Sequence, residues 1–548
     1  TLLASSAASD VYKRQNIYRV KDGSYNPETG EYDYQLLQTG DQFLSQSGIG
    51  RNSDQTFYFD ARLDWKRSFG DHNLTAMAMY MMREYRSDVL PNRNQGYSGR
   101  VTYDYASKYL VEFNFGYNGS ERLAAGQRFE FFPAVSAGWV ASSEKFWEPI
   151  SKYINHFKIR GSYGLVGSDA FASGAPHFLY QNNIGIGSAH KFWTGLPTSE
   201  ISKQGPGFYV LAVQDAGWEH VKKFDIGFDM MLFDQLNITF DYFHDKRERI
   251  LMSRASWPSM LGYWGSKPWS NIGEVENQGF ELSLNWTKQF GKDLTLDLRG
   301  NFTYNQNEYK YVDEPNYPYV WQTNTGKPLN TVKGYIAEGL FASEEEIANS
   351  PDQSQLGANI MPGDIKYRDI NGDGLITTED QVMISSYDWH PRIQYGFGLN
   401  IVYKNFDLGV FFNGSAKRKI MINSGIAPFL SGGGDGEEAE TLARNLMQWI
   451  ADDHWSVDNP NPNAAYPRLG LTKADVTNNV QPSTFWLRNG NFLRFKTLEI
   501  GYRLPYCRIY LSGDNLAVFS PFKLWDPELA WNAYPLSRTF NLGVQFTF

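Results

Sequence analysis

A stretch with the spacing of a calcium-binding loop begins at Asp369 and ends at Asp380. Oxygen-bearing side chains stand at the first, third and fifth positions, and a glycine stands at the sixth. Ca²⁺ takes about six to eight oxygen ligands, including a backbone carbonyl at the seventh position and a carboxylate at the twelfth. The last position is aspartate here, whereas a longer glutamate normally binds through both oxygens. We predict a Ca²⁺ site made by Asp369, Asn371, Asp373, Leu375 and Asp380. A simple Asn/Asp/Gly turn cluster is the alternative.

Two glutamates near several aromatic residues form a second candidate. Glu274 and Glu276 have the residue types of the acid and base of glycoside hydrolysis, and the tryptophans nearby could stack on sugar rings. Two carboxylates at the start of a strand are more often polar residues of a barrel interior, so we expect no catalysis. The aromatic residues of this long loop are predicted to contact a ligand or a covering partner, with packing inside the loop as the more common alternative. They are Trp257, Tyr263, Trp264 and Trp269.

Other catalytic arrangements are absent from the sequence. The eight histidines are scattered without a HExxH motif, and no segment resembles a nucleophile elbow. The glycines at 432–436 are not followed by the Lys-Ser/Thr pair of a phosphate-binding loop. Cys507 is the only cysteine, so an intrachain disulfide is excluded. We therefore expect that the protein is not an enzyme.

The composition excludes several classes of protein. The chain has 548 residues and a net charge of -9, which argues against a nucleic-acid partner. Aromatic residues make up 16% of the chain, far more than a disordered chain would carry. No run approaches the roughly 18 consecutive apolar residues of a membrane-spanning helix. Abundant aromatics and glycine with a mean hydropathy of -0.47 are typical of a transmembrane β-barrel, because only alternate strand residues face lipid.

Strict alternation of apolar and polar residues supports this class. At 109–119, for example, Tyr109, Val111 and Phe113 alternate with polar or small residues. The same pattern recurs along the chain and predicts about fifteen strands. Their ranges are 55–67, 72–86, 96–105, 109–119, 130–141, 156–166, 220–233, 236–247, 276–288, 293–306, 392–403, 406–414, 492–503, 506–513 and 537–548.

The predicted connections alternate between tight turns and long loops. Long loops are expected at 167–219, 248–275, 307–391, 415–491 and 514–536. Outer-membrane barrels have short periplasmic turns and long extracellular loops. The predicted fold class is therefore all-β: a transmembrane antiparallel β-barrel with long extracellular loops, integral to the bacterial outer membrane.

Strand parity predicts how the chain is divided. Bacterial barrels have even strand numbers, and an open edge in lipid would leave backbone groups without hydrogen bonds. About fifteen strands therefore predict that upstream sequence is missing. We expect residues 1–15 to be a non-native leader, 16–54 to be an extracellular loop or the truncated start of the barrel, and 55–548 to be a partial barrel without a plug.

Several segments resemble signatures of the SusC/RagA family of TonB-linked outer-membrane transporters. They are Asn92–Tyr105 (NRNQGYSGRVTYDY), Phe131–Trp147 (FFPAVSAGWVASSEKFW), Lys158–Gly167 (KIRGSYGLVG), Asn271–Leu284 (NIGEVENQGFELSL), Pro362–Asp380 (PGDIKYRDINGDGLITTED), Asn489–Gly501 (NGNFLRFKTLEIG), Ser512–Leu516 (SGDNL) and Tyr534–Phe548 (YPLSRTFNLGVQFTF). The resemblance implies a 22-stranded barrel filled by an N-terminal plug, with a SusD-like surface lipoprotein at its mouth. It also implies TonB-driven uptake, usually of glycan oligosaccharides and sometimes of peptides, with TonB contacting the missing N-terminal region.

The C-terminal strand and the absence of a repeat give two further expectations. The chain ends in an alternating strand with aromatic residues at Phe546 and Phe548, which we predict to be the signal for barrel assembly. A secreted glycan-binding β protein is the alternative from another class. A propeller would show a repeat of about 40–50 residues, and no such period is present.

Overall fold

The computed structural model describes most of the chain from residue 53 onward, together with two short strands before it. The described ranges are 17–20, 34–39, 53–87, 90–171, 175–194, 201–258, 260, 267–422, 448–470, 476–529 and 534–547. The chain divides into two compact units: Thr1–Phe57 with Glu84–Asn92, and Tyr58–Arg83 with Arg93–Phe548. In the first unit, β1 (Ile17–Val20) pairs antiparallel with β2 (Tyr34–Gln38). Within the described ranges, no helix is both long and apolar enough to cross a membrane.

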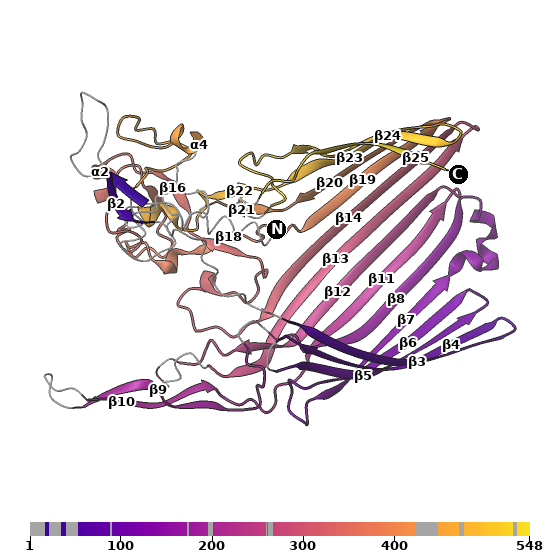
Figure 1. The fold of residues 1–548 in the computed structure, drawn as a ribbon, viewed down its shortest axis with the longest axis horizontal. Coiled ribbons are helices and arrows are strands. Elements are labelled where there is room, and N and C mark those ends of the chain that lie inside the picture. The colour runs from indigo at the N-terminus through magenta and orange to yellow at the C-terminus, as the bar shows by residue number, and fades with distance from the viewer. Residues whose placement is uncertain are drawn as a thin grey trace. The chain divides into compact units, whose positions relative to one another are not determined.

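One large antiparallel sheet of 15 strands dominates the structure (Figure 1). In chain order its strands are β3 (Gln55–Phe69), β4 (His72–Arg86), β5 (Asn92–Tyr105), β6 (Tyr109–Ser120), β7 (Phe129–Val140), β8 (Ile154–Ser168), β11 (Glu219–Leu232), β12 (Leu236–Ser253), β13 (Trp269–Phe290), β14 (Leu294–Tyr311), β19 (Ile393–Tyr403), β20 (Phe406–Ala416), β23 (Phe492–Arg503), β24 (Cys507–Phe519) and β25 (Thr539–Phe546). Every strand pairs with its neighbours in this chain order, from β3 at one edge to β25 at the other.

The sequence pattern located these strands correctly. Each of the fifteen predicted ranges overlaps one strand of the sheet, so the all-β barrel-wall prediction is confirmed. Two features were missed. The strands β12, β13 and β14 have 18, 22 and 18 residues and continue well beyond the predicted ends. The predicted loop 167–219 contains a separate hairpin of β9 (Asn183–Thr194) and β10 (Ile201–Val210).

Alternation gives the sheet an aromatic face and a polar face. On the aromatic face, phenylalanine rings from successive strands lie against one another, from Phe157 on β8 to Phe302 on β14. Their centroids are 6.0 Å apart for Phe157–Phe228, 5.6 Å for Phe228–Phe240, 6.1 Å for Phe240–Phe280 and 5.6 Å for Phe280–Phe302. Cross-strand aromatic pairs stabilise a sheet while presenting a surface suited to lipid.

Three long connections fold together at one end of the sheet: 312–392, 417–491 and 520–538. Their described elements are η4 (Val320–Gln322), β15 (Val332–Gly334), β16 (Ala337–Leu340), α2 (Glu344–Ala348), β17 (Ile365–Tyr367), η5 (Thr378–Asp380), β18 (Val382–Ser385), β21 (Lys419–Met421), α4 (Gln448–Ala451), η6 (Asn478–Val480) and β22 (Leu487–Asn489). We call their shared hydrophobic cluster the loop core. Its buried residues are Tyr335, Leu340, Leu356, Ile365, Tyr367, Ile376, Ile420, Ile422, Ile450, Trp455, Ala464, Tyr466, Trp486 and Phe522.

Candidate functional site: the polar wall and the loop core

Arg160 on β8 lies among three carboxylates from the next two strands on one side of it, β11 and β12. Its guanidinium is 2.5 Å from Asp241 on β12, and 3.2 Å and 3.6 Å from Asp229 and Asp225 on β11. Gly227 stands directly between Arg160 and Asp241 in the strand register. A Cβ on Gly227 would lie 2.2 Å from the Asp241 carboxylate, so the glycine leaves room for the ion pair. Lys158, on the same face of β8, is paired with Asp229, so a second cation stands beside these carboxylates.

A second cluster of the same kind lies on β20, β23 and β24. Arg508 Nε is 3.0 Å from Asp407 Oδ1, and Arg508 Nη2 is 2.5 Å from Glu499 Oε1. Arg503 is paired with Arg508 on the same face, so two bases stand beside two acids. The Arg508 guanidinium also lies over the Tyr510 ring, 5.0 Å from its centroid. Both clusters therefore hold an arginine whose charge is neutralised by neighbouring carboxylates.

The polar face is hollowed near the short turns. A concavity of about 760 Å³ is lined mainly by hydroxyl, small and charged side chains of β3–β8 and β11. Among its lining residues are Thr75, Thr102, Asp104, Glu112, Ser136, Lys158, Arg160, Ser162 and Asp225. We call this face of the sheet, with its two arginine clusters and this concavity, the polar wall.

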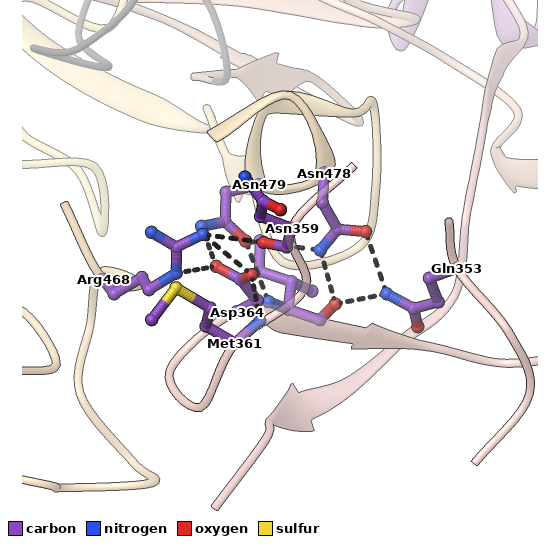
Figure 2. A network of polar contacts seen from close by, with 8 residues as sticks. Gln353, Asn359, Met361, Asp364, Arg468, Asn478 and Asn479 are labelled. Atoms are coloured by element: carbon purple, nitrogen blue, oxygen red, sulfur yellow. Dashed lines mark hydrogen bonds and ion pairs between the residues drawn. The ribbon is translucent and has the colours of Figure 1, made fainter. Parts of the chain in front are cut away.

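The loop core contains a buried ion pair between two different connections (Figure 2). The side chain of Asp364, at 1% exposure, lies 2.7 Å from Arg468 Nε and accepts a hydrogen bond from Arg468 Nη2 at 3.1 Å. It also accepts from Asn479 Nδ2 at 2.7 Å and from the Met361 amide at 2.9 Å. Burial raises the pKa of Asp364 above its usual value. The contacts with Arg468 and Asn479 join connection 312–392 to connection 417–491.

Amide side chains take the place of a neighbouring strand along β17. The Ile365 amide donates to Asn479 Oδ1 at 2.9 Å, and its carbonyl accepts from Asn478 Nδ2 at 2.9 Å. Gln353 donates to the same carbonyl at 3.0 Å and accepts from the Tyr367 amide at 2.8 Å. Buried backbone groups need partners, and here side chains more than 100 residues away supply two of them.

A third arginine holds connection 520–538 on the strand ends. Arg494 on β23, at 1% exposure, lies 2.5 Å from Asp526 and 3.0 Å from Glu528. Arg418 donates to the Glu528 carbonyl at 3.0 Å. The three connections are thus linked to one another and to the sheet by buried polar contacts, which gives the loop core a defined position above β20 and β23.

The predicted calcium loop is ordered by its own backbone. Asp369 accepts from the Gly372 and Gly374 amides at 2.7 and 2.9 Å, and Asp373 accepts from Leu375 at 2.8 Å. Asp380 is buried and accepts from the Ile370 and Thr377 amides, both at 2.8 Å. In the part of the chain that the structure describes, no group of three or more His, Cys, Asp or Glu is arranged to hold a metal. The predicted ligand set also includes Asn371 and the Leu375 carbonyl, so calcium binding stays a prediction.

The structure places Glu274 and Glu276 away from the polar wall, which corrects the interpretation that they line an interior. The register puts Glu276 on the same face as Phe280. Lys310 lies 3.1 Å from Glu276, and Lys246 lies 3.4 Å from Glu274. Strand parity explains the error, because even-numbered residues of β13 face outward with the aromatic row.

The aromatic residues of the predicted contact loop have separate environments. Trp257 is half-buried at the base of the loop, where its amide donates to the Arg254 carbonyl at 3.2 Å. Trp269 begins β13 and packs against buried Leu179, Ala216 and Leu251. Tyr263 and Trp264 lie outside the described residues, so contact with cargo or a lid stays a prediction.

The predicted assembly signal is described in part. Phe546 closes β25 and is 62% exposed, in keeping with a lipid-facing position, whereas Phe548 lies outside the described residues. Sequence reasoning also missed the arginine clusters and the buried network. Asp225 and Asp229, four residues apart, were visible in the sequence, but nothing local identified Arg160 as their partner.

These features together define the class: a membrane β-barrel wall with a polar inner face and a folded set of loops at its long-loop end. A family model described as TonB dependent receptor-like, beta-barrel matches residues 4–516, and the chain belongs to this family. Membership confirms the predicted location in the outer membrane.

Named relatives support the same assignment. The chain is 28% identical to TonB-dependent receptor P3 of Formosa agariphila over 92% of its length and 54% of the relative's. It is 24% identical to TonB-dependent receptor SusC of Bacteroides thetaiotaomicron over 85% of its length and 45% of the relative's. The chain spans about half the length of the curated relatives that it matches.

Solved structures agree on the fold. The RagAB peptide transporter aligns with a TM-score of 0.67 at 19% identity, covering 90% of this chain and 55% of that one. The RagAB peptide importer in its open-open state aligns with a TM-score of 0.68 over the same shares. The resemblance to SusC and RagA predicted from the sequence motifs is confirmed.

Proposed function

We propose that this chain forms much of the wall and mouth of a transporter that imports a nutrient oligomer across the outer membrane. TonB drives the uptake, and a SusD-like lipoprotein serves as the extracellular partner. The observation that carries the proposal is the two-faced sheet: an aromatic face suited to lipid backs a polar wall suited to a hydrated cargo. The loop core supplies an ordered surface at the mouth. The cargo crosses the membrane without chemical conversion.

The charges of the polar wall favour a neutral glycan oligosaccharide as cargo. Arg160 and Arg508 are each held by more than one carboxylate, so neither offers a free positive charge. The charged residues that line the concavity are balanced, with Lys66, Lys158 and Arg160 against Asp104, Glu112 and Asp225, and such a surface suits a neutral oligomer. Hydroxyl and amide groups remain to hydrogen-bond sugar hydroxyls.

Peptide uptake is the second candidate. It is favoured by the structural likeness to the RagAB peptide transporter, although 19% identity supports the fold alone. The balanced charges that line the concavity would suit peptides without a large net charge.

Uptake by cells expressing the receptor with its lipoprotein partner tests both proposals. Three fluorescent probes are compared: a neutral malto-oligosaccharide mixture, a sulfated oligosaccharide mixture and a tryptic casein digest. Accumulation of the neutral glycan that disappears in a strain without TonB is the expected result. TonB-dependent accumulation of the peptides alone would establish the second candidate, and equal accumulation without TonB would contradict active transport.

A further inference from the structure

Pairing between β7 and β8 ends before either strand does. The two strands are paired from Val140↔Lys158 up to Ala134↔Gly164. Beyond that point β7 stays paired with β6 as far as Phe129, and β8 stays paired with β11 as far as Ser168. The sheet therefore contains a seam, which we define as 129–133 of β7 facing 165–168 of β8.

Pro133 stands where this seam begins. Hydrogen bonds from Ser120 N to Arg128 O and from Val140 N to Lys108 O join β7 to β6 through even-numbered residues of β7. Because backbone groups alternate in direction along an antiparallel strand, the odd-numbered residues of β7 point toward β8. Proline has no N–H, so residue 133 cannot donate to β8. The sequence thus removes the ladder bond at the position where pairing stops.

The Phe132 ring fills the seam and packs against Gly167, which has no side chain. Phe132, at 6% exposure, belongs to a small buried cluster with Leu123 and Trp218. A Cβ on Gly167 would lie 2.1 Å from the Phe132 ring. Glycine at 167 is therefore required for the ring to occupy the space between the strands.

A polar contact also crosses the seam. Glu130 on β7 lies 2.7 Å from His220 on β11 and 3.6 Å from Arg249 on β12. His220 is paired with Gly167, so the contact passes over β8 where that strand has no side chain. Arg249 has a φ of 55° within an irregular part of the β12–β13 pairing. The two sides are held by side chains that can separate without breaking any strand ladder.

We propose that this seam is a hinge in the barrel wall, at which the long-loop ends of β5–β7 swing away from β8–β12. The lower part of β7 and β8 stays paired and acts as the pivot. At the level of the seam the outward face carries ion pairs: Lys222, which is paired with Leu165, lies 2.5 Å from Glu248. Charged side chains on the outward face lie beyond the apolar band, so the seam opens outside the hydrocarbon, where water can satisfy the backbone. Opening widens the mouth, whatever the cargo.

Hydrogen exchange of the receptor in lipid nanodiscs tests whether the missing hydrogen-bond donor at Pro133 weakens the pairing of β7 with β8. In the native protein, the amides of Leu165 and Gly167 should exchange faster than those of Tyr163 and Gly161, which face β7 in the paired part. Pro133→Val restores a donor and should slow exchange at Leu165 by about tenfold or more. Gly167→Ala displaces the Phe132 ring and should speed exchange at 165–168. Gly161→Ala is the matched control, since its Cβ would lie an ordinary 3.5 Å from the Asp225 carbonyl.

Spin-label distances test the motion itself. In a Cys507→Ser background, labels at Ala125 and Asp215 report on the two sides of the seam, and labels at Ser107 and Lys152 report on the short-turn end. A broad or two-peaked distance distribution for the first pair, narrowed by Pro133→Val, with a narrow one for the second pair supports the hinge. Equal, narrow distributions for both pairs, or exchange that Pro133→Val leaves unchanged, would overturn it.

Discussion

The sheet and the loop core solve the problem of buried polar groups in opposite ways. In the sheet, the backbone groups of paired residues bond to the adjacent strand, and charged side chains such as Arg160 stay partly hydrated. In the loop core, Asp364 and Arg468 belong to two different connections, lie 104 residues apart in the sequence and are almost fully buried. A local pattern therefore determines the sheet, whereas specific distant partners determine the loop core.

The largest expected effect comes from breaking the alternation that makes the sheet. Phe546→Ser places a polar group on the lipid-facing side of the last strand, so barrel assembly should fail and the protein should collect in the periplasm. Outer-membrane yield and heat-modifiability measure this. Gln545→Ser, on the other face of the same strand, is the control. Normal assembly of the Phe546 variant would contradict the predicted assembly signal.

The next effect should arise in the loop core. Arg468→Met leaves the buried Asp364 carboxylate without its cation, and breaking such a pair costs about 3–5 kcal/mol. Local unfolding of connections 312–392 and 417–491 should follow while the sheet remains folded. Limited proteolysis, with barrel heat-modifiability as the internal reference, detects the difference.

The corresponding change in the polar wall should be milder. Arg160→Met leaves three neighbouring carboxylates that water can still reach, so about 1–2 kcal/mol is expected. Equal losses of stability in Arg468→Met and Arg160→Met would contradict the difference between the loop core and the polar wall. Arg62→Met, which affects an exposed pair with Asp64, should change neither measurement.

These regions also differ in how far sequence alone could predict them. Alternation located all fifteen strands because period-two patterning is local and the aromatic face is continuous. The hairpin β9–β10 was missed inside a long loop. Asn478, Asn479 and Gln353 could not be found, because their role depends on an approach to β17 from elsewhere in the chain. Glu276 was assigned to the wrong face, because a shift of one residue reverses every side chain of a strand.

Calcium binding would make one part of the loop core depend on a cation. If Ca²⁺ occupies the site at Asp369 and Asp373, EGTA should increase proteolysis of 341–391 several-fold, and added Ca²⁺ but not Mg²⁺ should reverse it. The double variant Asp369→Ala, Asp373→Ala should behave as the chelated protein does. Cleavage unaffected by EGTA would favour the turn cluster held by backbone amides alone.

The smallest expected effect is an opposite pH response of two neighbouring segments. Burial raises the pKa of Asp364, so its contribution to stability is full below about pH 3.9 and is lost as pH rises through the folded-state value. The Ala342 amide and Lys366 lower the pKa of Glu346, whose contribution is present above about pH 4.3 and lost as pH falls.

Hydrogen exchange between pH 7 and pH 4, corrected for intrinsic rates, should therefore show β17 gaining protection while α2 loses it. Asp364→Asn should abolish the first trend, and Glu346→Gln the second. Parallel trends in both segments would contradict the assigned causes.

The amide side chains along β17 affect how prone the protein is to aggregate. An unpaired strand edge is a template on which other chains add, and that is a common route to aggregation. Here the Ile365 amide and carbonyl and the Tyr367 amide are already occupied by Asn479, Asn478 and Gln353. The edge of β17 is closed to an incoming strand, so this part of the loop core does not recruit neighbouring copies of the protein.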